Sequence, residues 1–229
     1  MNFLTNTKLA IQGIYGSVML LRDPSKLDKV FTILDSLEGS DKAEEAAKEF
    51  VDNPAFDRVF NDKPGLTNID LASLATMPEG TLGRIFADEF KARGLRAEDI
   101  QLRADDGTKQ GYVFKHLRET HDVWHTVTGF DVDVPGELGL QAFYLAQFNS
   151  GLSMVILALG FLNTLFYAPA DRIARVDAIA RGWQMGRAAK PLFGVDWAAR
   201  WNTPLESIRE ELGVVAVRAQ QPMLMPVAA

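Results

Sequence analysis

An all-α fold in a single multi-helix domain is what the sequence predicts, and three observations support it. Apolar residues recur at helical spacing along most of the chain, signals for helix starts and ends flank these stretches, and convincing strand alternation is missing. With 229 residues, 47% of them hydrophobic and 24% charged, the chain can bury one substantial core. We therefore expect one domain over residues 1–215 and a loosely ordered tail over residues 216–229, which holds two prolines and no apolar periodicity.

Short helices make up the predicted N-terminal half. Asp23 is a typical N-cap residue, and Pro24 fits the first position of the helix that follows. Gly94 stands where a glycine commonly ends a helix. From such signals and the spacing of apolar residues we expect helices over residues 9–21, 25–37, 40–51, within 53–65, near 70–75 and over 78–94.

Two helices of the C-terminal half have clear boundaries in the sequence. The first is expected from about residue 111 to Thr128, with Gly129 ending it. Near the C-terminus, Thr203, Pro204 and Glu206 match the N-cap, the first helical residue and the reciprocal third residue of a capping box. This pattern predicts a helix start at that point.

The longest uncharged segment of the chain runs from Leu138 to Ala170. Its stretch GLSMVILALGFLNTLFYA has 18 uncharged positions, which is about the lower limit for spanning a bilayer. Ser153, Asn163 and Thr164 interrupt the stretch, and strongly basic flanks are missing. These features favour a buried central helix or the wall of an apolar pocket. A transmembrane span and partial membrane contact are the alternatives.

Composition excludes several classes of function. With 24 basic and 30 acidic residues and a pI near 5.1, the chain has no basic field for a nucleic acid partner. It has no cysteine, so disulfides, thiolate metal sites and thiol nucleophiles are excluded, and a metal ion would need imidazole and carboxylate ligands. Neither a signal peptide nor a transit peptide is predicted, which favours a cytoplasmic location of the bacterial type.

The stretch HDVWHTVTGFDVDVPGE, residues 121–137, holds two of the three histidines of the chain. On a helix, His121 and His125 lie about 40° apart and Asp122 about 60° from His125, so the three side chains occupy one narrow arc. The loop after them, with two glycines and a proline, can bring Glu137 back beside this arc. Two imidazoles with one or two carboxylates suit zinc, and two histidines with one carboxylate also suit ferrous iron.

Simpler roles for the same residues stay open. Two histidines four residues apart occur by chance on many helices. Asp122 could instead orient one imidazole, and Glu137 could simply favour a helix N-terminus. His116 lies about 140° around the helix from His121, so we expect a surface or partly buried residue and not a ligand.

The pattern His-Asp, two residues, His, eleven residues, Glu resembles the signature of the ubiquinone (coenzyme Q) biosynthesis protein family of the Coq-four type. It fits at His121, Asp122, His125 and Glu137. The segments PEGTLG at 78–83, MGR at 185–187 and RWNTPLESIREELGV at 200–214 also resemble family segments, in the same order. The resemblance covers most of the chain, from about residue 5 to 215.

This resemblance implies an all-α fold in which the four side chains hold a divalent metal, usually zinc, beside a hydrophobic cavity for a polyprenyl lipid. It also implies peripheral membrane association. The family is linked to oxidative removal of the ring carboxyl of a polyprenylated hydroxybenzoate precursor, with a hydroxyl in its place, and to organising other ubiquinone-biosynthesis enzymes. We expect a homodimer.

One departure from the family pattern falls in the helix after Glu137. Where relatives often carry lysine and glutamate, this chain has Gln141 and Tyr144. The charged side chains of the relatives are missing at these two positions. An alternative is therefore that this chain is a relative that binds another isoprenoid or apolar ligand.

Two hypotheses on function follow from the resemblance. In the first, the chain is a metal-dependent decarboxylase and hydroxylase, and Asp122 lies behind the metal so that one coordination position opens. In the second, four protein ligands close a structural zinc site, and the chain is a non-catalytic scaffold that binds isoprenoid lipid.

Overall fold

The computed structural model describes residues 47–66, 69–100 and 106–217. Residues 47–51 are helical. The helices that follow are, in chain order, η1 (Pro54–Phe56), α4 (Asp57–Asp62), α5 (Leu71–Leu74), α6 (Leu82–Ala92), η2 (Ala97–Asp99), α7 (Lys109–Thr128), α8 (Val134–Phe148), α9 (Gly151–Phe166), η3 (Pro169–Asp171), α10 (Arg172–Ala188), η4 (Ala198–Arg200) and α11 (Leu205–Leu212).

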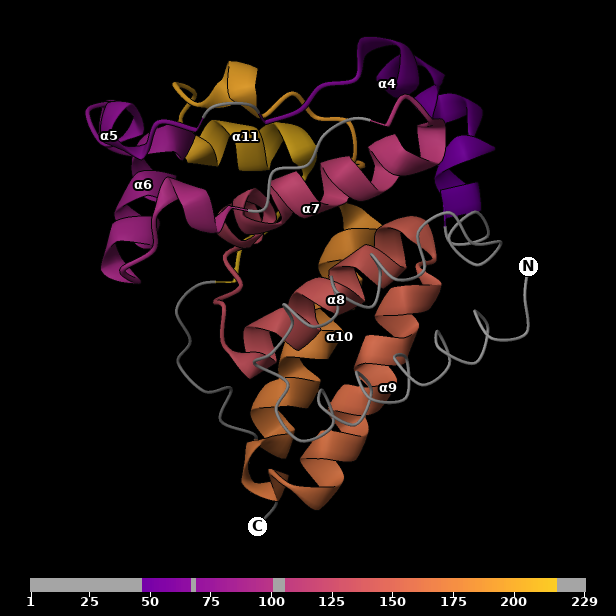
Figure 1. The fold of residues 1–229 in the computed structure, drawn as a ribbon. Coiled ribbons are helices and arrows are strands. Elements are labelled where there is room, and N and C mark those ends of the chain that lie inside the picture. The colour runs from indigo at the N-terminus through magenta and orange to yellow at the C-terminus, as the bar shows by residue number, and fades with distance from the viewer. Residues whose placement is uncertain (1–46, 67–68, 101–105, 218–229) are drawn as a thin grey trace.

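The helices form two groups that meet at α7 and α8. In the view of Figure 1, α4, α5, α6, α7 and α11 make up the upper group, and α8, α9 and α10 run together below it. Within the described residues the extended structure is limited to one isolated bridge, between Thr81 and Pro204. The prediction of an all-α fold is therefore confirmed.

The local helix signals were mostly correct. Asp70 caps α5, Gly94 follows α6 with a φ of 69°, and Gly129 ends α7 with a φ of 76°. The helices predicted over residues 9–21 and 25–37, and most of the helix over 40–51, lie outside the described residues, as do residues 218–229 of the predicted tail.

The predicted capping box at the start of α11 is wrong. Pro204 is the N-cap residue, and no side chain caps the helix. The backbone N–H of Leu205 donates instead to the carbonyl of Gly80 at 2.9 Å, and the N–H of Leu82 donates to the carbonyl of Thr203 at 2.9 Å. The first backbone N–H group of each helix thus donates to a carbonyl just before the other helix, and at α11 these tertiary hydrogen bonds replace a local side-chain cap.

Aromatic side chains fill the centre of the main core. The Phe193 ring lies 4.7 Å from the ring of Phe50 and 5.0 Å from that of Phe56, between centroids. Trp124 of α7 stacks on Tyr144 of α8 at 4.6 Å and 16°. These contacts join the N-terminal helices, α7, α8 and the segment after α10 into one apolar interior.

Glycines allow α8 and α10 to approach very closely. A Cβ atom built on Gly182 of α10 would lie only 1.9 Å from the carbonyl oxygen of Gly139 on α8, and one on Gly186 would lie 2.7 Å from that of Phe143. Since real Cβ atoms essentially never come within 3.0 Å of such a neighbour, these positions have room only for glycine. This contact fixes α8, which carries Glu137, against α10.

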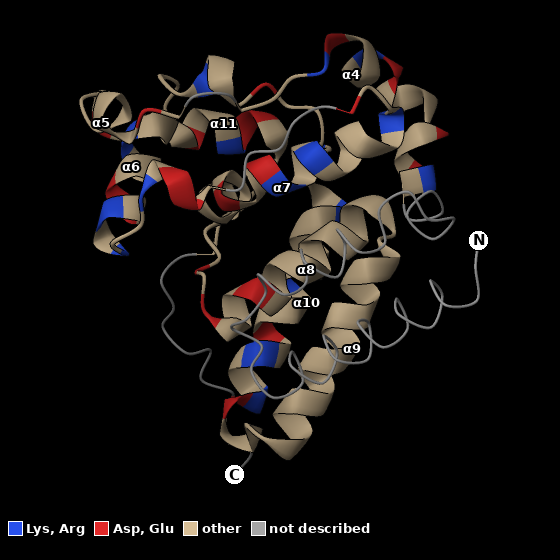
Figure 2. Ribbon diagram, in the orientation of Figure 1, with Lys and Arg blue, Asp and Glu red and all other residues tan. Residues whose placement is uncertain are grey.

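The buried-helix interpretation of the uncharged segment is correct for α8 and wrong for α9. Leu140 and Phe143 of α8 are fully buried. On α9, by contrast, Met154 is 55% exposed and Phe166 is 67% exposed. Figure 2 shows α9 as a helix without charged residues, next to charged segments on the other helices.

Candidate metal centre

The candidate site forms where the C-terminal half of α7 faces the first turn of α8. His121 and His125 lie one helical turn apart on α7, as their spacing predicts. Gly129 then ends α7 and the chain reverses. Asp133 caps α8 by accepting a hydrogen bond from the N–H of Gly136 at 2.8 Å, which places Glu137 in the first turn.

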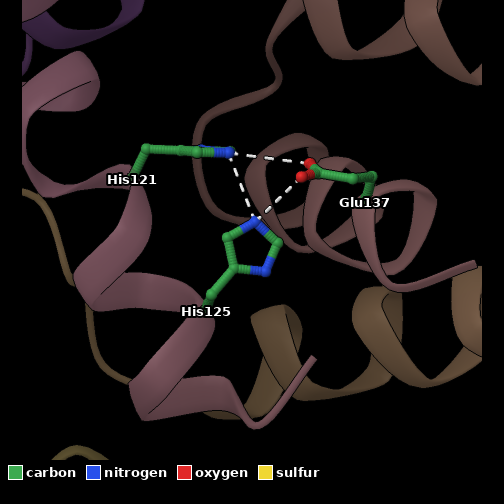
Figure 3. Close-up of side chains that lie close together, drawn as sticks. All are labelled: His121, His125 and Glu137. Atoms are coloured by element: carbon green, nitrogen blue, oxygen red, sulfur yellow. Dashed lines mark hydrogen bonds and ion pairs between the residues drawn. The ribbon is translucent and has the colours of Figure 1, made fainter. Parts of the chain in front are cut away.

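His121, His125 and Glu137 converge, and their ligand atoms all lie within 4.8 Å of one another. Nε2 of His125 lies 3.3 Å from Nε2 of His121 and 3.2 Å from Oε1 of Glu137, and Nε2 of His121 lies 3.6 Å from Oε2 of Glu137 (Figure 3). Ligand atoms in a tetrahedral zinc shell, each about 2.0–2.1 Å from the ion, are separated by about 3.3–3.4 Å. The spacing of the three side chains fits such a shell.

The hydrogen bonds of His125 direct a lone pair into this cluster. Nδ1 of His125 lies 3.0 Å from the carbonyl oxygen of Phe130, which can only accept. In a neutral imidazole the proton is therefore on Nδ1, and Nε2 presents its lone pair to Oε1 of Glu137. Two acceptors that face each other at 3.2 Å need a cation between them, either a proton or a metal ion.

Glu137 is a half-buried carboxylate without a full set of hydrogen-bond partners. Its Oε2 is buried and has no hydrogen-bond partner among the described residues. Burial alone raises the pKa of the Glu137 carboxyl, but the charge that His125 has when it is protonated and the hydrogen bonds of His121 and His125 outweigh burial and hold this pKa far below its usual value. The carboxyl is therefore ionised, which suits a metal ligand.

Asp122 lies near the cluster but is not one of its three members. It is half-buried, and its ligand atoms are not in the group that lies within 4.8 Å. Burial lowers the pKa of His121, but the hydrogen bond and charge of Glu137 and the charge of Asp122 raise it above its usual value. The negative charge of Asp122 thus acts on the site, while its role as a direct ligand stays a prediction.

Tyr144 is a site residue that the sequence did not reveal. Its hydroxyl lies 3.3 Å from Nδ1 of His121, so it can accept the Nδ1 proton and leave Nε2 free for a metal ion. Burial, followed by the charges of Glu137 and Asp122, raises the pKa of Tyr144 well above its usual value, so the phenol stays protonated. The sequence feature that could have identified Tyr144 as a site residue is its position seven residues after Glu137, which puts both on the same face of α8. Gln141, the other departure, accepts a hydrogen bond from Ser153 at 2.9 Å.

His116 is fully buried, so the prediction of a surface or partly buried residue is wrong. Its Nδ1 lies 3.0 Å from the carbonyl oxygen of Pro64, and its Nε2 accepts from the N–H of Gly194 at 3.0 Å. Burial lowers the pKa of His116 to about 4. His116 is thus a neutral residue that joins three distant segments of the chain.

A cleft of about 740 Å³ opens beside His125. It lies between α6, the loop after α7, and the starts of α8 and α10, and Pro135, Gly136 and Ala178 line part of it. Four charged residues also line it: Glu89, Arg93, Asp131 and Asp133. This cleft has the size of a small-molecule site, but it is more polar than the apolar lipid cavity that the sequence predicts.

Contacts from α6 and α11 hold the end of α7 that carries His125. Arg209 donates from Nε to the carbonyl of Val127 at 2.9 Å and from Nη2 to the carbonyl of Thr126 at 2.9 Å. Thr126 also donates from its hydroxyl to Glu89 at 2.5 Å. A guanidinium at a helix C-terminus satisfies free carbonyls and opposes the helix dipole, so Arg209 fixes this end of α7.

Comparison with known proteins shows the family of this chain. The family model described as "Coenzyme Q (ubiquinone) biosynthesis protein Coq4" matches residues 3–218. The chain belongs to this family. The Coq4 protein of Coprinopsis cinerea is 27% identical over 217 residues, which cover 93% of this chain and 72% of that protein. The Rattus norvegicus homologue is 28% identical, over 86% of this chain and 74% of its own length.

A solved structure supports the fold of this Coq4-family chain. A crystal structure from Nostoc punctiforme, assigned by name to ubiquinone biosynthesis, superposes with a TM-score of 0.76 at 31% identity. The superposition covers 90% of this chain and 99% of that one.

The comparisons and the helices also bear on location. The fungal and rat relatives are named as mitochondrial proteins. In the described part of this Coq4-family chain, no single helix has both the length and the apolar character to cross a bilayer. Helices α9 and α10 taken together have that length and apolar character, but the chain bends by 115° between them.

Proposed function

We propose that this Coq4-family chain acts in ubiquinone biosynthesis through a divalent metal held by His121, His125 and Glu137. Asp122 completes the set, either as a fourth ligand or as an acceptor that orients an imidazole. The observation that carries the proposal is the convergence of three donor atoms at 3.2–3.6 Å. Oε2 of Glu137, which is buried and makes no hydrogen bond within the described residues, also supports it.

Zinc is the metal that we propose, with ferrous iron as the alternative, because the ligands are imidazole and carboxylate. Once held by these residues, a divalent cation would supply Lewis acidity, which can stabilise negative charge on an oxygen of the substrate. The protein prepares the ligands: the Phe130 carbonyl fixes the tautomer of His125, and Tyr144 accepts the proton of His121. Burial excludes water from His125, which is 1% exposed.

The substrate that we propose is a polyprenylated hydroxybenzoate. Its ring carboxyl leaves as CO2, water supplies the oxygen of the new hydroxyl, and dioxygen accepts the two electrons and two protons that are released and becomes hydrogen peroxide. The cleft beside His125 is large enough for the aromatic head group. The prenyl tail would extend along the uncharged helices α8 and α9.

A non-catalytic scaffold that organises other ubiquinone-biosynthesis enzymes around a structural zinc is the second candidate. Asp122 as a fourth ligand would favour it, because structural zinc sites have four protein ligands and leave no open position. For both candidates we propose a homodimer in peripheral contact with a membrane, on the cytoplasmic side in a bacterial-type cell.

Metal content tests the site. We expect about one metal ion per chain in the purified protein and its loss in His121→Ala and Glu137→Ala. Glu98→Ala, which removes an exposed carboxylate that is not part of the triad, serves as the control and should keep the metal. Full metal content in both triad variants would refute the proposal.

Turnover separates the two candidates. The metal-loaded protein is incubated with a polyprenyl hydroxybenzoate and dioxygen, and mass spectrometry follows loss of the carboxyl. Product formed by the wild type but not by Glu137→Ala supports the enzyme. Lipid that co-purifies without any turnover supports the scaffold.

A further inference from the structure

Helix α9 buries three polar side chains and exposes most of its large apolar ones, although Ile156 and Leu157 are buried. The side chains that face the protein include Ser153, Asn163 and Thr164, each at most 8% exposed. The side chains that face outward form a stripe along the helix, which we call the α9 face: Met154, Val155, Phe161, Leu162, Leu165 and Phe166. Their exposed fractions range from 43% to 67%. A helix on a water-exposed surface shows the opposite arrangement.

Buried hydrogen bonds hold α9 in this orientation. Asn163 accepts from Nη1 of Arg175 on α10 at 2.6 Å, and Thr164 accepts from the same nitrogen at 3.2 Å. Ser153 donates to Gln141 of α8 at 2.9 Å. Rotating α9 so that its apolar stripe turned inward would break these contacts and leave Nη1 of Arg175, a residue that is 4% exposed, without its partners, although Nη2 would keep its ion pair with Asp171 at 3.0 Å. The outward apolar stripe is therefore a fixed feature of the fold.

The α9 face matches lipid better than it matches a protein partner. Six large apolar side chains, each 43–67% exposed, lie along one side of a single helix, and large exposed apolar patches mark interaction sites with proteins or membranes. No charged residue occurs from Leu138 to Ala170, and Figure 2 shows none on α9. Protein interfaces are about as polar as the rest of a surface and have a polar rim. An uncharged apolar stripe along the whole helix can be buried among lipid acyl chains without burying a charge.

The end of α9 carries the residues that favour a membrane interface. Tyr167 is 56% exposed and Ile173, just beyond the turn, is 62% exposed. The exposed side chain of Arg172 lies between them in sequence. Tyrosine and arginine beside an apolar stripe suit the headgroup region, where a ring can lie at the boundary and a guanidinium can pair with anionic lipid.

We propose that the α9 face inserts into one leaflet of a bilayer and lies parallel to its surface. The helix has 16 residues and spans about 24 Å, which is shorter than the ~30 Å hydrocarbon core, so it does not cross the membrane. An interfacial helix buries its apolar side by about 5–10 Å. This inference deepens the peripheral membrane contact in the proposed function by naming the surface that makes it.

Contact with lipid at α9 lies one helix away from the candidate metal site. The Gly160 backbone of α9 packs against Leu138 of α8, so closely that a Cβ on Gly160 would lie 2.4 Å from Cδ2 of Leu138. Leu138 directly follows Glu137 in the chain. A prenylated substrate that leaves the bilayer along α9 therefore arrives beside the helix that carries a metal ligand.

Vesicle binding by the full-length chain tests the proposal. The probes are vesicles of phosphatidylethanolamine with phosphatidylglycerol, and vesicles of phosphatidylcholine alone. In a flotation assay we expect the wild type to bind the vesicles that contain phosphatidylglycerol. The double variant Leu165→Glu, Phe166→Glu should bind them at least tenfold more weakly. Val215→Glu is the matched control, because Val215 is an exposed apolar residue outside α9, and it should bind like the wild type.

Labelling tests the depth of the same face. The chain has no cysteine, so Leu162→Cys and Val215→Cys each accept one polarity-sensitive fluorophore. With vesicles present, we expect a blue shift and quenching by lipid-borne quenchers at position 162 only. Equal vesicle binding by the double glutamate variant, or no shift at position 162, would overturn the proposal.

Two further outcomes would also overturn it. One is a wild type that ignores vesicles and forms a dimer that the double variant cannot form, which would make a second copy the occupant of the face. The other is a label at position 162 that is already shielded from a soluble quencher without vesicles, which would mean that the chain covers this face itself. Metal content, measured on the same samples, reports separately on the triad.

Discussion

Replacing Gly182 with alanine should destabilise the protein, although alanine favours helices. The new Cβ would lie 1.9 Å from the carbonyl oxygen of Gly139, so α8 and α10 must separate by about an ångström to restore normal contact. Overpacking of this kind costs about 1–3 kcal/mol, and the helix propensity of alanine returns at most about 1 kcal/mol. We expect a net loss of about 1–2 kcal/mol in the free energy of unfolding.

Urea unfolding of Gly182→Ala and of a matched control measures this effect. Gly151→Ala is the control, because no heavy atom lies within 4 Å of its Cβ position and its φ is not positive. It should be neutral or slightly stabilising. Since Glu137 lies two residues before Gly139, the shift of α8 should also weaken metal binding in Gly182→Ala. If Gly182→Ala is as stable as the wild type, the close contact of α8 with α10 is not present in solution.

Three more predictions follow from buried polar groups. Burial lowers the pKa of His116 to about 4 from an unfolded value of 6.5, so protons bind the unfolded chain first, and about 3 kcal/mol of stability should be lost as the pH falls from 6.5 to 4. His116→Gln should flatten the dependence of unfolding free energy on pH in that window, and an unchanged slope would contradict the assignment. Tyr144→Phe should weaken metal affinity about tenfold in chelator competition, with unfolding in urea almost unchanged, because only the acceptor for Nδ1 of His121 is lost. Asn163→Leu should lower the free energy of unfolding by about 2–3 kcal/mol, because it removes the acceptor that lies 2.6 Å from Nη1 of the buried Arg175. A loss below about 1 kcal/mol would argue against a buried hydrogen bond between these two side chains.

The parts of the site that depend on local geometry could be predicted from the sequence. His121 and His125 meet because residues four apart share a helix face. Glu137 returns to them because Gly129 takes a positive φ and only five residues, 129–133, connect the two helices. Short-range rules are sufficient for such a cluster, and the comparisons support the family resemblance based on its pattern.

Features that depend on distant partners could not be predicted. The partners of His116, Pro64 and Gly194, are 52 and 78 residues away, so no local pattern showed that it is buried. The Thr203 capping box failed because the Gly80 carbonyl, far away in the chain, takes the N–H of Leu205.

The outward side of α9 is a further example of this limit. The composition of α9 indicated an apolar helix, but it did not indicate which side faces outward. That side is determined by where Arg175 of α10 meets Asn163. The family resemblance marked Tyr144 only as a position where a charged residue of the relatives is missing. Its contact with His121 is a feature of the three-dimensional structure.

The C-terminal segment closes over the turn that joins the two ligand-bearing helices. The N–H of Val217 donates to the carbonyl of Thr128 at 2.9 Å, and a Cβ on Gly129 would lie 2.8 Å from the carbonyl oxygen of Val217. The turn between the ligand-bearing helices therefore gains this backbone contact only after residue 217 has been synthesised, well after both helices.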